Sequence, residues 1–186
     1  MTEIRREQWA KKCPSNATVV RIDTTMTVIV HRVPATTSGG LAERPVCVVE
    51  LSAADLEADG VARLLASVSA YADGFPPLSA KGLAADARGR SGRVVRAWSA
   101  ARTDGAVQGL ISLAEAAVSG RPRFSIPWLV VDPRDRRRGV GTGLVRVALA
   151  AAAEAGATDV RVETLSTWTA AAAFWAQLAR RTAAEG

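Results

Sequence analysis

The run Arg136-Arg137-Arg138-Gly139-Val140-Gly141-Thr142-Gly143 holds the residues whose types and spacing best suit a chemical task. It follows an apolar, strand-like stretch at residues 126–131 and opens an alanine-rich helical stretch at residues 144–155. A strand that turns through glycines into a helix exposes unpaired backbone N–H groups at the positive end of the helix dipole. Phosphate groups bind at such ends, and glycines let the main chain approach them closely. With three arginines beside the turn, the run predicts a cradle for a pyrophosphate.

Two common phosphate loops do not fit this run. A Walker A loop needs a lysine followed by Ser or Thr, and a Rossmann loop needs glycines spaced G-x-G-x-x-G near the start of a βαβ unit. Here Arg136, Gly139 and Gly141 are spaced R-x-x-G-x-G, just after Val131-Asp132-Pro133. This pattern resembles the acetyl-CoA pyrophosphate motif of the GNAT superfamily of N-acetyltransferases, V-x-P-x-x-[RQ]-x-x-G-x-[GA] between a strand and a helix. Every fixed position of that motif is met.

The resemblance implies an N-acetyltransferase that uses acetyl-CoA as co-substrate and acts on an amine. It also implies which residues contact acetyl-CoA: the end of the strand, the turn, the first helical residues, and the start of the last helix. These are Leu129, Val130, Val131, Arg136, Arg137, Arg138, Gly139, Val140, Gly141, Thr142 and Trp168.

The order of expected elements predicts an α/β fold with a mixed sheet, similar to the GNAT fold. Residues 1–16 are expected to form a flexible basic arm, residues 17–44 an extra β-rich segment and loop, and residues 45–186 the GNAT-like domain. In this domain we expect strands at 46–51, 93–100, 106–116, 124–131 and 159–164, and helices at 56–71, 78–88, 144–155 and 167–181.

Pro127 lies in the middle of an expected strand. Proline cannot donate to a β-ladder, so it marks either an edge strand or a bulge. GNAT proteins usually carry a bulge in this strand, which separates it from the next strand and makes room for pantetheine. Pro127 is therefore consistent with the resemblance.

The last helix and the chain beyond it depart from the family pattern. Trp168 stands where the family commonly has an asparagine, and Trp175 where it has a tyrosine that donates a proton to the departing thiolate. Indole has no useful acidity near neutral pH. The family also continues with two more strands, and none is expected after Arg181. We hypothesise that residues 18–33, or a second subunit in a homodimer, pair with the strand at 159–164.

The chemistry implied by the resemblance is direct attack of an amine on a thioester. The amine must lose a proton to a base, and Glu115 and Glu163, each near a strand end, are the candidate catalytic residues. Backbone N–H groups near residues 129–131 would polarise the thioester oxygen. No Ser/His/Asp or Cys/His arrangement is readable, and the single histidine, His31, is expected at the surface.

Composition limits the other classes. A chain of 186 residues suits one domain. Its apolar stretches are interrupted by charges, and its first residues lack an apolar core, so neither a membrane helix nor a secretory signal is expected. Cys13 and Cys47 lack metal-ligand spacing, so we expect no metal site. We also expect the protein to be cytoplasmic and bacterial.

Two alternatives to the leading interpretation remain. A non-catalytic module on the same fold could bind coenzyme A or a protein partner, since the usual acid and the last strands are missing. The net charge of +6 suggests an acetyltransferase that acts on aminoacyl-tRNA. Because no nucleic-acid module is recognisable, the support for nucleic-acid binding is weak.

Overall fold

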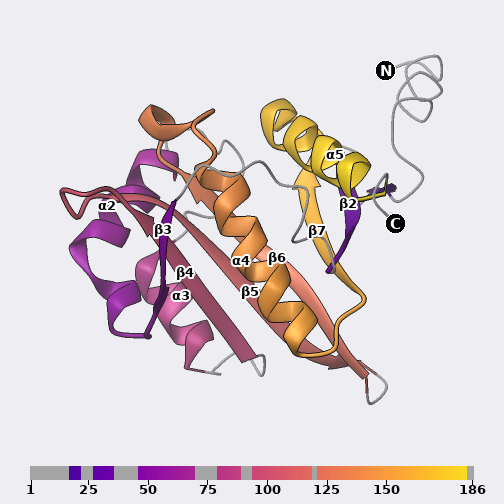
Figure 1. Cartoon of the computed structure of the whole chain (residues 1–186), viewed down its shortest axis with the longest axis horizontal. Helices are drawn as coiled ribbons and strands as arrows, with labels where there is room; N and C mark the ends of the chain where they lie inside the picture. The colour runs from indigo at the N-terminus through magenta and orange to yellow at the C-terminus, as the bar shows by residue number, and fades with distance from the viewer. Residues whose placement is uncertain are drawn as a thin grey trace.

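The computed structural model describes residues 17–21, 27–35, 46–69, 79–88, 94–118 and 121–183. In this part of the chain, seven strands form one mixed sheet in the order β1-β2-β7-β6-β5-β4-β3 (Figure 1). The expected α/β class with a mixed sheet is thus confirmed. The expected basic arm, residues 1–16, lies outside the described residues.

One half of the sheet is an antiparallel run of neighbours in sequence. It consists of β3 (Cys47–Leu51), β4 (Val94–Ala101), β5 (Val107–Val118) and β6 (Arg121–Val131). β3 pairs with β4, β4 with β5, and β5 with β6, each in antiparallel register. These short-range pairings form the frame on which the predicted motif is placed.

The other half joins segments from opposite ends of the sequence. β1 (Ala17–Arg21) and β2 (Thr27–Pro34) form a hairpin, and β2 pairs antiparallel with β7 (Asp159–Leu165). The register places Val30 opposite Glu163. The hypothesis that the N-terminal segment pairs with this strand is confirmed. The alternative of a second subunit at this edge of β7 does not apply, because β2 occupies it.

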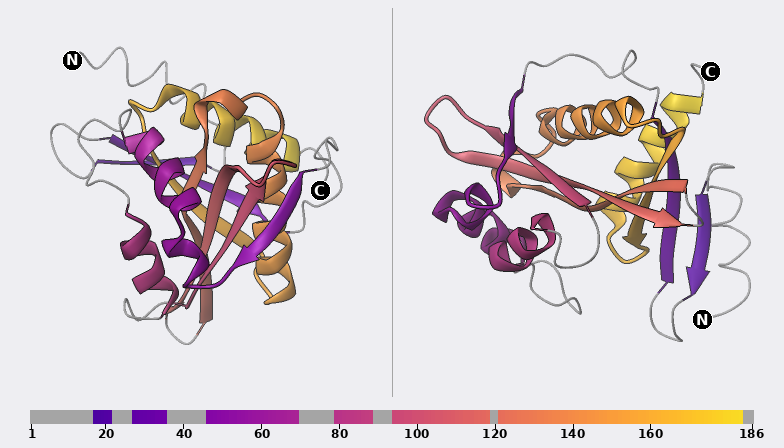
Figure 2. Two further views of the ribbon diagram at one scale, coloured as in Figure 1. Left: turned by 90° about the vertical axis from the view of Figure 1, so that its left-hand side faces the viewer. Right: turned by 90° about the horizontal axis from the view of Figure 1, so that it is seen from below.

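Two helices cover each face of the sheet (Figure 2). α2 (Asp59–Ser69) and α3 (Ala80–Ala87) pack against the β3–β6 half, where Leu110 and Val130 meet Leu64 and Leu83. α4 (Val140–Glu154) and α5 (Thr169–Ala183) cover the opposite face and form the larger core, which includes Leu144 and Trp175. Neither α2 nor α3 extends over β7 and β2.

Local signals account for two helix boundaries. Ser52 and Asp55 form a capping box: the Ser52 backbone N–H donates to Asp55 Oδ2 at 2.8 Å, and the Asp55 N–H donates to Ser52 Oγ at 3.2 Å. The Ser52 hydroxyl and, after it, the Ser52 backbone N–H donate to Asp55 Oδ2 and hold the pKa of Asp55 below its ordinary value. The helix expected from residue 56 is split, because a 3₁₀ turn (Asp55–Glu57) precedes α2. Gly156, with φ +85°, follows the end of α4, where a left-handed glycine commonly ends a helix.

Candidate functional site

The predicted cradle lies where β6 passes into α4. Asp132 begins the connecting 3₁₀ turn, η2 (Pro133–Asp135), and accepts hydrogen bonds from the backbone N–H and the guanidinium of Arg134 at 2.9 and 3.0 Å. The Arg134 guanidinium, followed by its backbone N–H, lowers the pKa of Asp132. The turn is therefore fixed at its first residue by an ionised carboxylate.

The first turn of α4 presents the backbone donors that the motif predicts. Gly139 precedes the helix with φ +86°, a left-handed conformation that favours glycine. The first helical bond runs from the Gly143 N–H to the Gly139 carbonyl, at 2.9 Å. The N–H groups of Val140, Gly141 and Thr142 precede that bond, so they point out of the positive end of the helix. This end can hold a diphosphate.

Gly109 on β5 allows α4 to lie close to the sheet. A Cβ built on this residue would be 2.8 Å from the Val130 backbone oxygen and 3.0 Å from Leu144 Cδ1. A side chain here would push away either β6 or the first turns of α4. The sequence analysis missed this residue, because a glycine inside a strand gives no sign of which helix will cross it.

Asp135 links the cradle to the turn between β4 and β5. Its carboxylate is fully buried. It lies 3.4 Å from Arg102 Nη1 and 3.6 Å from Arg138 Nη1, and it accepts a hydrogen bond from Gln108 Nε2 at 3.3 Å. Three donors from two segments thus converge on one carboxylate. An acid inside an arginine run was the available signal, and sequence reasoning did not use it.

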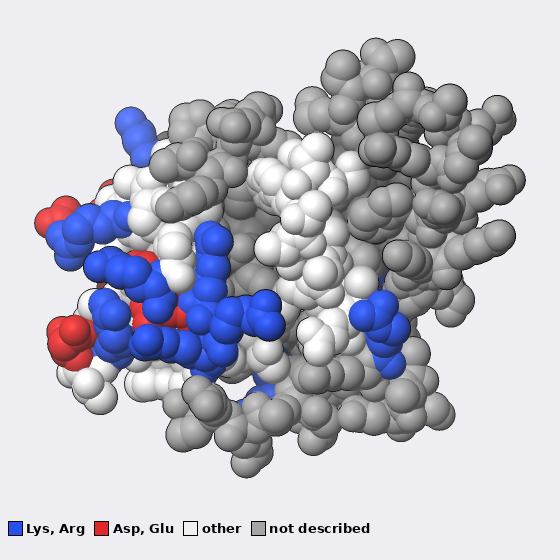
Figure 3. All heavy atoms as spheres, turned by 90° about the horizontal axis from the view of Figure 1, so that it is seen from above, with Lys and Arg blue, Asp and Glu red and all other residues white. Residues whose placement is uncertain are grey.

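The remaining arginines of the motif are on the surface. Arg136, Arg137 and Arg138 are exposed, and Arg136 Nε donates to the Val131 carbonyl at 3.4 Å. Arg137 has φ +62°, which is unusual for a residue with a side chain and costs energy. Figure 3 shows Lys and Arg side chains gathered on the face at the η2 end of the molecule. This end is suited to anionic ligands.

β6 and β7 separate beyond a bulge at Pro127. They pair in parallel at three positions, of which Ile126 with Val162 is the last. On the other side of β6, the register with β5 shifts between Ser112 and Ala114, so that Ile126 and Pro127 both face Leu113. Because β6 lies inside the sheet, Pro127 marks a bulge and not an edge. Of the two alternatives for Pro127, the structure has the bulge, and a gap opens between the strands toward the cradle.

Two backbone N–H groups of β6 are aimed into this gap. The Asp132 N–H donates to the Gln108 carbonyl of β5 at 2.8 Å. Because backbone groups alternate in direction along a strand, the N–H groups of Leu129 and Val131 point away from β5, toward β7. Val130, in contrast, directs its N–H toward β5 and packs its side chain under α2 and α3.

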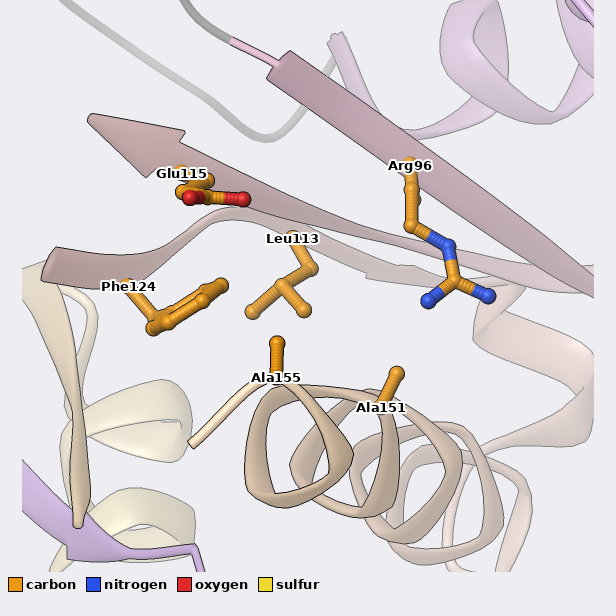
Figure 4. Close-up of a pocket in the computed structure, with 6 residues that line it drawn as sticks. All are labelled: Arg96, Leu113, Glu115, Phe124, Ala151 and Ala155. Atoms are coloured by element: carbon orange, nitrogen blue, oxygen red, sulfur yellow. The ribbon is translucent and has the colours of Figure 1, made fainter. Parts of the chain in front are cut away.

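The two candidate bases lie at different places. Glu163 is exposed on β7, just past the last pairing with β6, on the face opposite α5. Glu115 lies on the α4 face with Ala151 and Ala155 (Figure 4). Those residues are eleven or more positions along α4 from Val140, or roughly 17 Å at the helical rise. The structure brings Glu163 to the gap and keeps Glu115 apart from it.

Figure 4 also shows Arg96 on the other side of this small pocket from Glu115, with Leu113 between them. Arg96 donates to both oxygens of Glu50, at 2.8 and 2.9 Å, and lies over the Trp98 ring. These bonds lower the pKa of Glu50. The arrangement stabilises the pairing of β3 with β4 and contributes nothing to the gap.

The tryptophans in the family's polar positions take different places. Trp168 precedes α5 and packs against Val30 and Leu165 on the face opposite α5. Trp175 is buried in the main core, with its ring 5.0 Å from that of Phe174. Phe174 approaches the first turn of α4, where a Cβ on Gly141 would be 3.8 Å from its ring.

His31 is buried on β2, opposite Val162, so the expectation of a surface histidine is wrong. Neither ring nitrogen of His31 has a hydrogen-bond partner. The hydroxyl of Thr164, nearby on β7, has none either. Burial lowers the pKa of His31. The residue was misplaced because sequence reasoning had no helix to put over this strand, whereas α5 covers it.

Within the described segments, no group of three or more His, Cys, Asp or Glu residues could hold a metal ion. No helix among them is long and apolar enough to span a membrane.

Comparisons with known proteins agree with this geometry. Residues 65–179 match the sequence profile of the Acetyltransferase (GNAT) family. No curated protein matches the sequence. Among solved structures, a ribosomal-protein-alanine N-acetyltransferase from Brucella melitensis superposes with a TM-score of 0.58 at 22% identity, covering 73% of this chain and 91% of that one. An acetyltransferase from Trypanosoma brucei gives 0.51 at 24% identity, covering 66% and 85%.

An aminoglycoside acetyltransferase from an uncultured soil sample gives a TM-score of 0.56 at 18% identity, covering 72% of this chain and 86% of that one. At these identities the likeness shows the fold alone. The acceptors named for these proteins therefore do not identify the acceptor of this chain.

Proposed function

Because the chain belongs to the Acetyltransferase (GNAT) family, we propose that it transfers an acetyl group from acetyl-CoA to an amine. The observation that supports this proposal is that the N-terminal end of α4 lies next to the gap between β6 and β7. The unpaired N–H groups of Val140, Gly141 and Thr142 lie at the end of the gap that opens between β6 and β7. A diphosphate held at the helix end leaves its pantetheine arm free to enter the gap.

The residues present fit such a ligand. The cradle supplies backbone donors and exposed arginines for the diphosphate. Gly141 leaves room beside Val131 and Phe174, since a Cβ there would meet nothing closer than 3.6 Å. Trp168 is a candidate contact for the ligand, because it lies next to the end of β7, which runs parallel to β6.

Acetyl-CoA would supply an activated thioester. The N–H groups of Leu129 and Val131 are placed to polarise its oxygen in the gap. Glu163, on the open face of β7, takes the proton of the attacking amine. The new N–C bond forms as the C–S bond breaks. The departing thiolate takes a proton from water, because the Trp175 indole has no acidic proton to give.

A second candidate function is coenzyme A binding without transfer, and one observation favours it. The family's tyrosine position is filled by Trp175, which is buried in the core. Thiol release from acetyl-CoA in the presence of a panel of amines separates the two functions. Amine-dependent release supports the transferase, and binding without release supports the second candidate.

The cradle itself is tested by Gly139→Glu. This change puts a strained side chain and a negative charge where the diphosphate would lie. We expect acetyl-CoA affinity to fall at least about 100-fold, because two or more charge-assisted hydrogen bonds are lost. The matched control is Gly156→Glu, which also replaces a left-handed glycine, but after the other end of α4. If calorimetry shows equal affinities for the two variants, the cradle assignment is wrong.

A further inference from the structure

Arg137 is the strained residue of the turn before α4. Among the described residues, it is the one residue other than glycine that has a left-handed backbone, with φ +62°. The other positive φ angles belong to Gly105, Gly139 and Gly156, which adopt them without strain. A side chain in this conformation costs free energy, and residues of this kind cluster at ligand-binding and catalytic sites. The strain at Arg137 therefore indicates that its side chain has a function.

Two neighbouring arginines of the turn already have carboxylate partners within the chain. Arg134 Nη2 lies 3.0 Å from Asp132 Oδ2. Arg138 Nη1 lies 3.6 Å from Asp135 Oδ1. Arg137 is exposed, and its guanidinium has no ion pair or hydrogen bond with any residue that the structure describes. Its side chain is therefore available to a ligand, whereas those of Arg134 and Arg138 contribute to the order of the turn.

The side chain of Arg137 starts at the rim of the proposed cradle. Arg137 lies two residues before Gly139, which directly precedes α4. The first N–H groups of α4 are the donors proposed above for the diphosphate. Coenzyme A carries a second anionic group, the phosphate monoester on its ribose 3′-oxygen, with a charge of about −1.5 to −2 near neutral pH. A long side chain at the rim can extend to this group while the diphosphate is bound at the helix end.

Resting on the proposed function, we infer that Arg137 binds the 3′-phosphate of coenzyme A and thereby selects coenzyme A over the same molecule without that phosphate. A guanidinium offers two parallel N–H donors that match two phosphate oxygens. The backbone donors of α4 cannot make this selection, because both molecules contain the diphosphate. The selection therefore requires a further donor beside the cradle, and Arg137 supplies it.

The strained backbone provides two variants that separate binding from stability. Arg137→Gln and Arg137→Gly both remove the guanidinium, but only glycine adopts a left-handed φ without strain. We expect the glycine variant to unfold at a higher temperature than the glutamine variant, which thermal unfolding measures. Selection for the 3′-phosphate should nevertheless be lost in both variants. A loss that is shared by a more stable and a less stable variant is due to the missing guanidinium and not to altered folding.

The test measures the affinities of the full chain for coenzyme A and for 3′-dephospho-coenzyme A by calorimetry, which needs no turnover. For the wild type we expect coenzyme A to bind about tenfold or more tightly than the dephospho form, because a charge-assisted pair of hydrogen bonds is made only with the phosphate. Arg137→Gln and Arg137→Gly should bring this ratio close to one. They should do so by weakening the binding of coenzyme A, while the affinity for the dephospho form stays the same.

Arg134→Gln is the matched control, because it removes an equal charge from the same turn but from a guanidinium that Asp132 already binds. We expect it to keep the ratio of the two affinities. Equal binding of both ligands by the wild type, an unchanged ratio in Arg137→Gln, or an equal loss of the ratio in Arg134→Gln would overturn the inference and leave the cradle in place. Failure of the proposed function is seen separately, because then neither ligand binds or no amine-dependent thiol release occurs.

Discussion

The two sides of the gap between β6 and β7 are built in different ways. On the β6 side, the strand, the turn η2 and helix α4 follow one another from Arg121 to Glu154. On the β7 side, the neighbouring strand β2 comes from the other end of the sequence, and Val30 meets Glu163. The proposed cofactor cradle thus lies in one continuous stretch, whereas the surface around Glu163 is assembled from distant segments.

The largest loss of stability is expected on the β7 side, from Val33→Asp. This change tests whether β2 belongs to the core. Val33 is fully buried among residues of α4, α5 and β7. An unpaired carboxylate at this place should lower the free energy of unfolding by at least about 3 kcal/mol. Denaturant titration measures it. The control is Val49→Asp on the edge strand β3, where Val49 is 49% exposed. Similar losses in both variants would mean that β2 is not an integral strand.

A smaller effect is expected on the β6 side from Asp135→Asn. The amide keeps the shape of the side chain and removes the charge that faces Arg102 and Arg138. Stability should fall by about 1–3 kcal/mol, and acetyl-CoA should bind several-fold more weakly because Arg138 is no longer held. Asp104→Asn is the control, because this exposed partner of Arg102 lies outside the cradle. If Asp104→Asn lowers stability and acetyl-CoA affinity as much as Asp135→Asn does, the buried carboxylate is not what orders the turn.

The smallest effect concerns pH and returns to the β7 side. Burial lowers the pKa of His31, so the folded protein binds this proton less readily than the unfolded chain. The contribution to stability is therefore present above 6.5, the ordinary pKa of histidine, and is lost as the pH falls below it. The loss amounts to about 1.4 kcal/mol for each unit that separates the two pKa values.

His31→Leu should flatten this part of the profile. Thermal unfolding between pH 8 and pH 5 measures the slope, and the carboxylates with lowered pKa values, such as Asp132 and Glu50, titrate below this window. A variant that loses stability with falling pH as steeply as the wild type would show that another group is responsible.

Features within one continuous segment were predicted more fully from the sequence than contacts between distant segments. The spacing of Arg136, Gly139 and Gly141 predicted the strand, turn and helix of the proposed cradle, and Pro127 limited β6 to an edge or a bulge, because these signals lie within one strand–turn–helix unit. The strand at 159–164 was also predicted to pair with either the N-terminal segment or a second subunit, and the first alternative is correct. In contrast, the contacts of Asp135 with Arg102 and the close approach at Gly109 depend on pairings between strands. Periodicity within one segment carries no information about them.

The two candidate bases and His31 also depend on contacts that the sequence does not reveal. Glu115 and Glu163 are equivalent in sequence terms, since each is an acid near the end of an expected strand. The register of β7 with β6 and the position of α4 distinguish them, and both are tertiary properties. The burial of His31 likewise depends on α5, which follows it by more than 130 residues.

The pairing of β2 with β7 also sets an order of events during synthesis. The hairpin β1–β2 leaves the ribosome about 130 residues before its partner strand, a delay on the order of ten seconds at ordinary elongation rates. Throughout that time one edge of β2 has no neighbour from its own sheet, and an open edge is a template for pairing with other chains. β1 and β2 are therefore synthesised long before β7. Correct folding requires that this edge of β2 stays unpaired until β7 has been made.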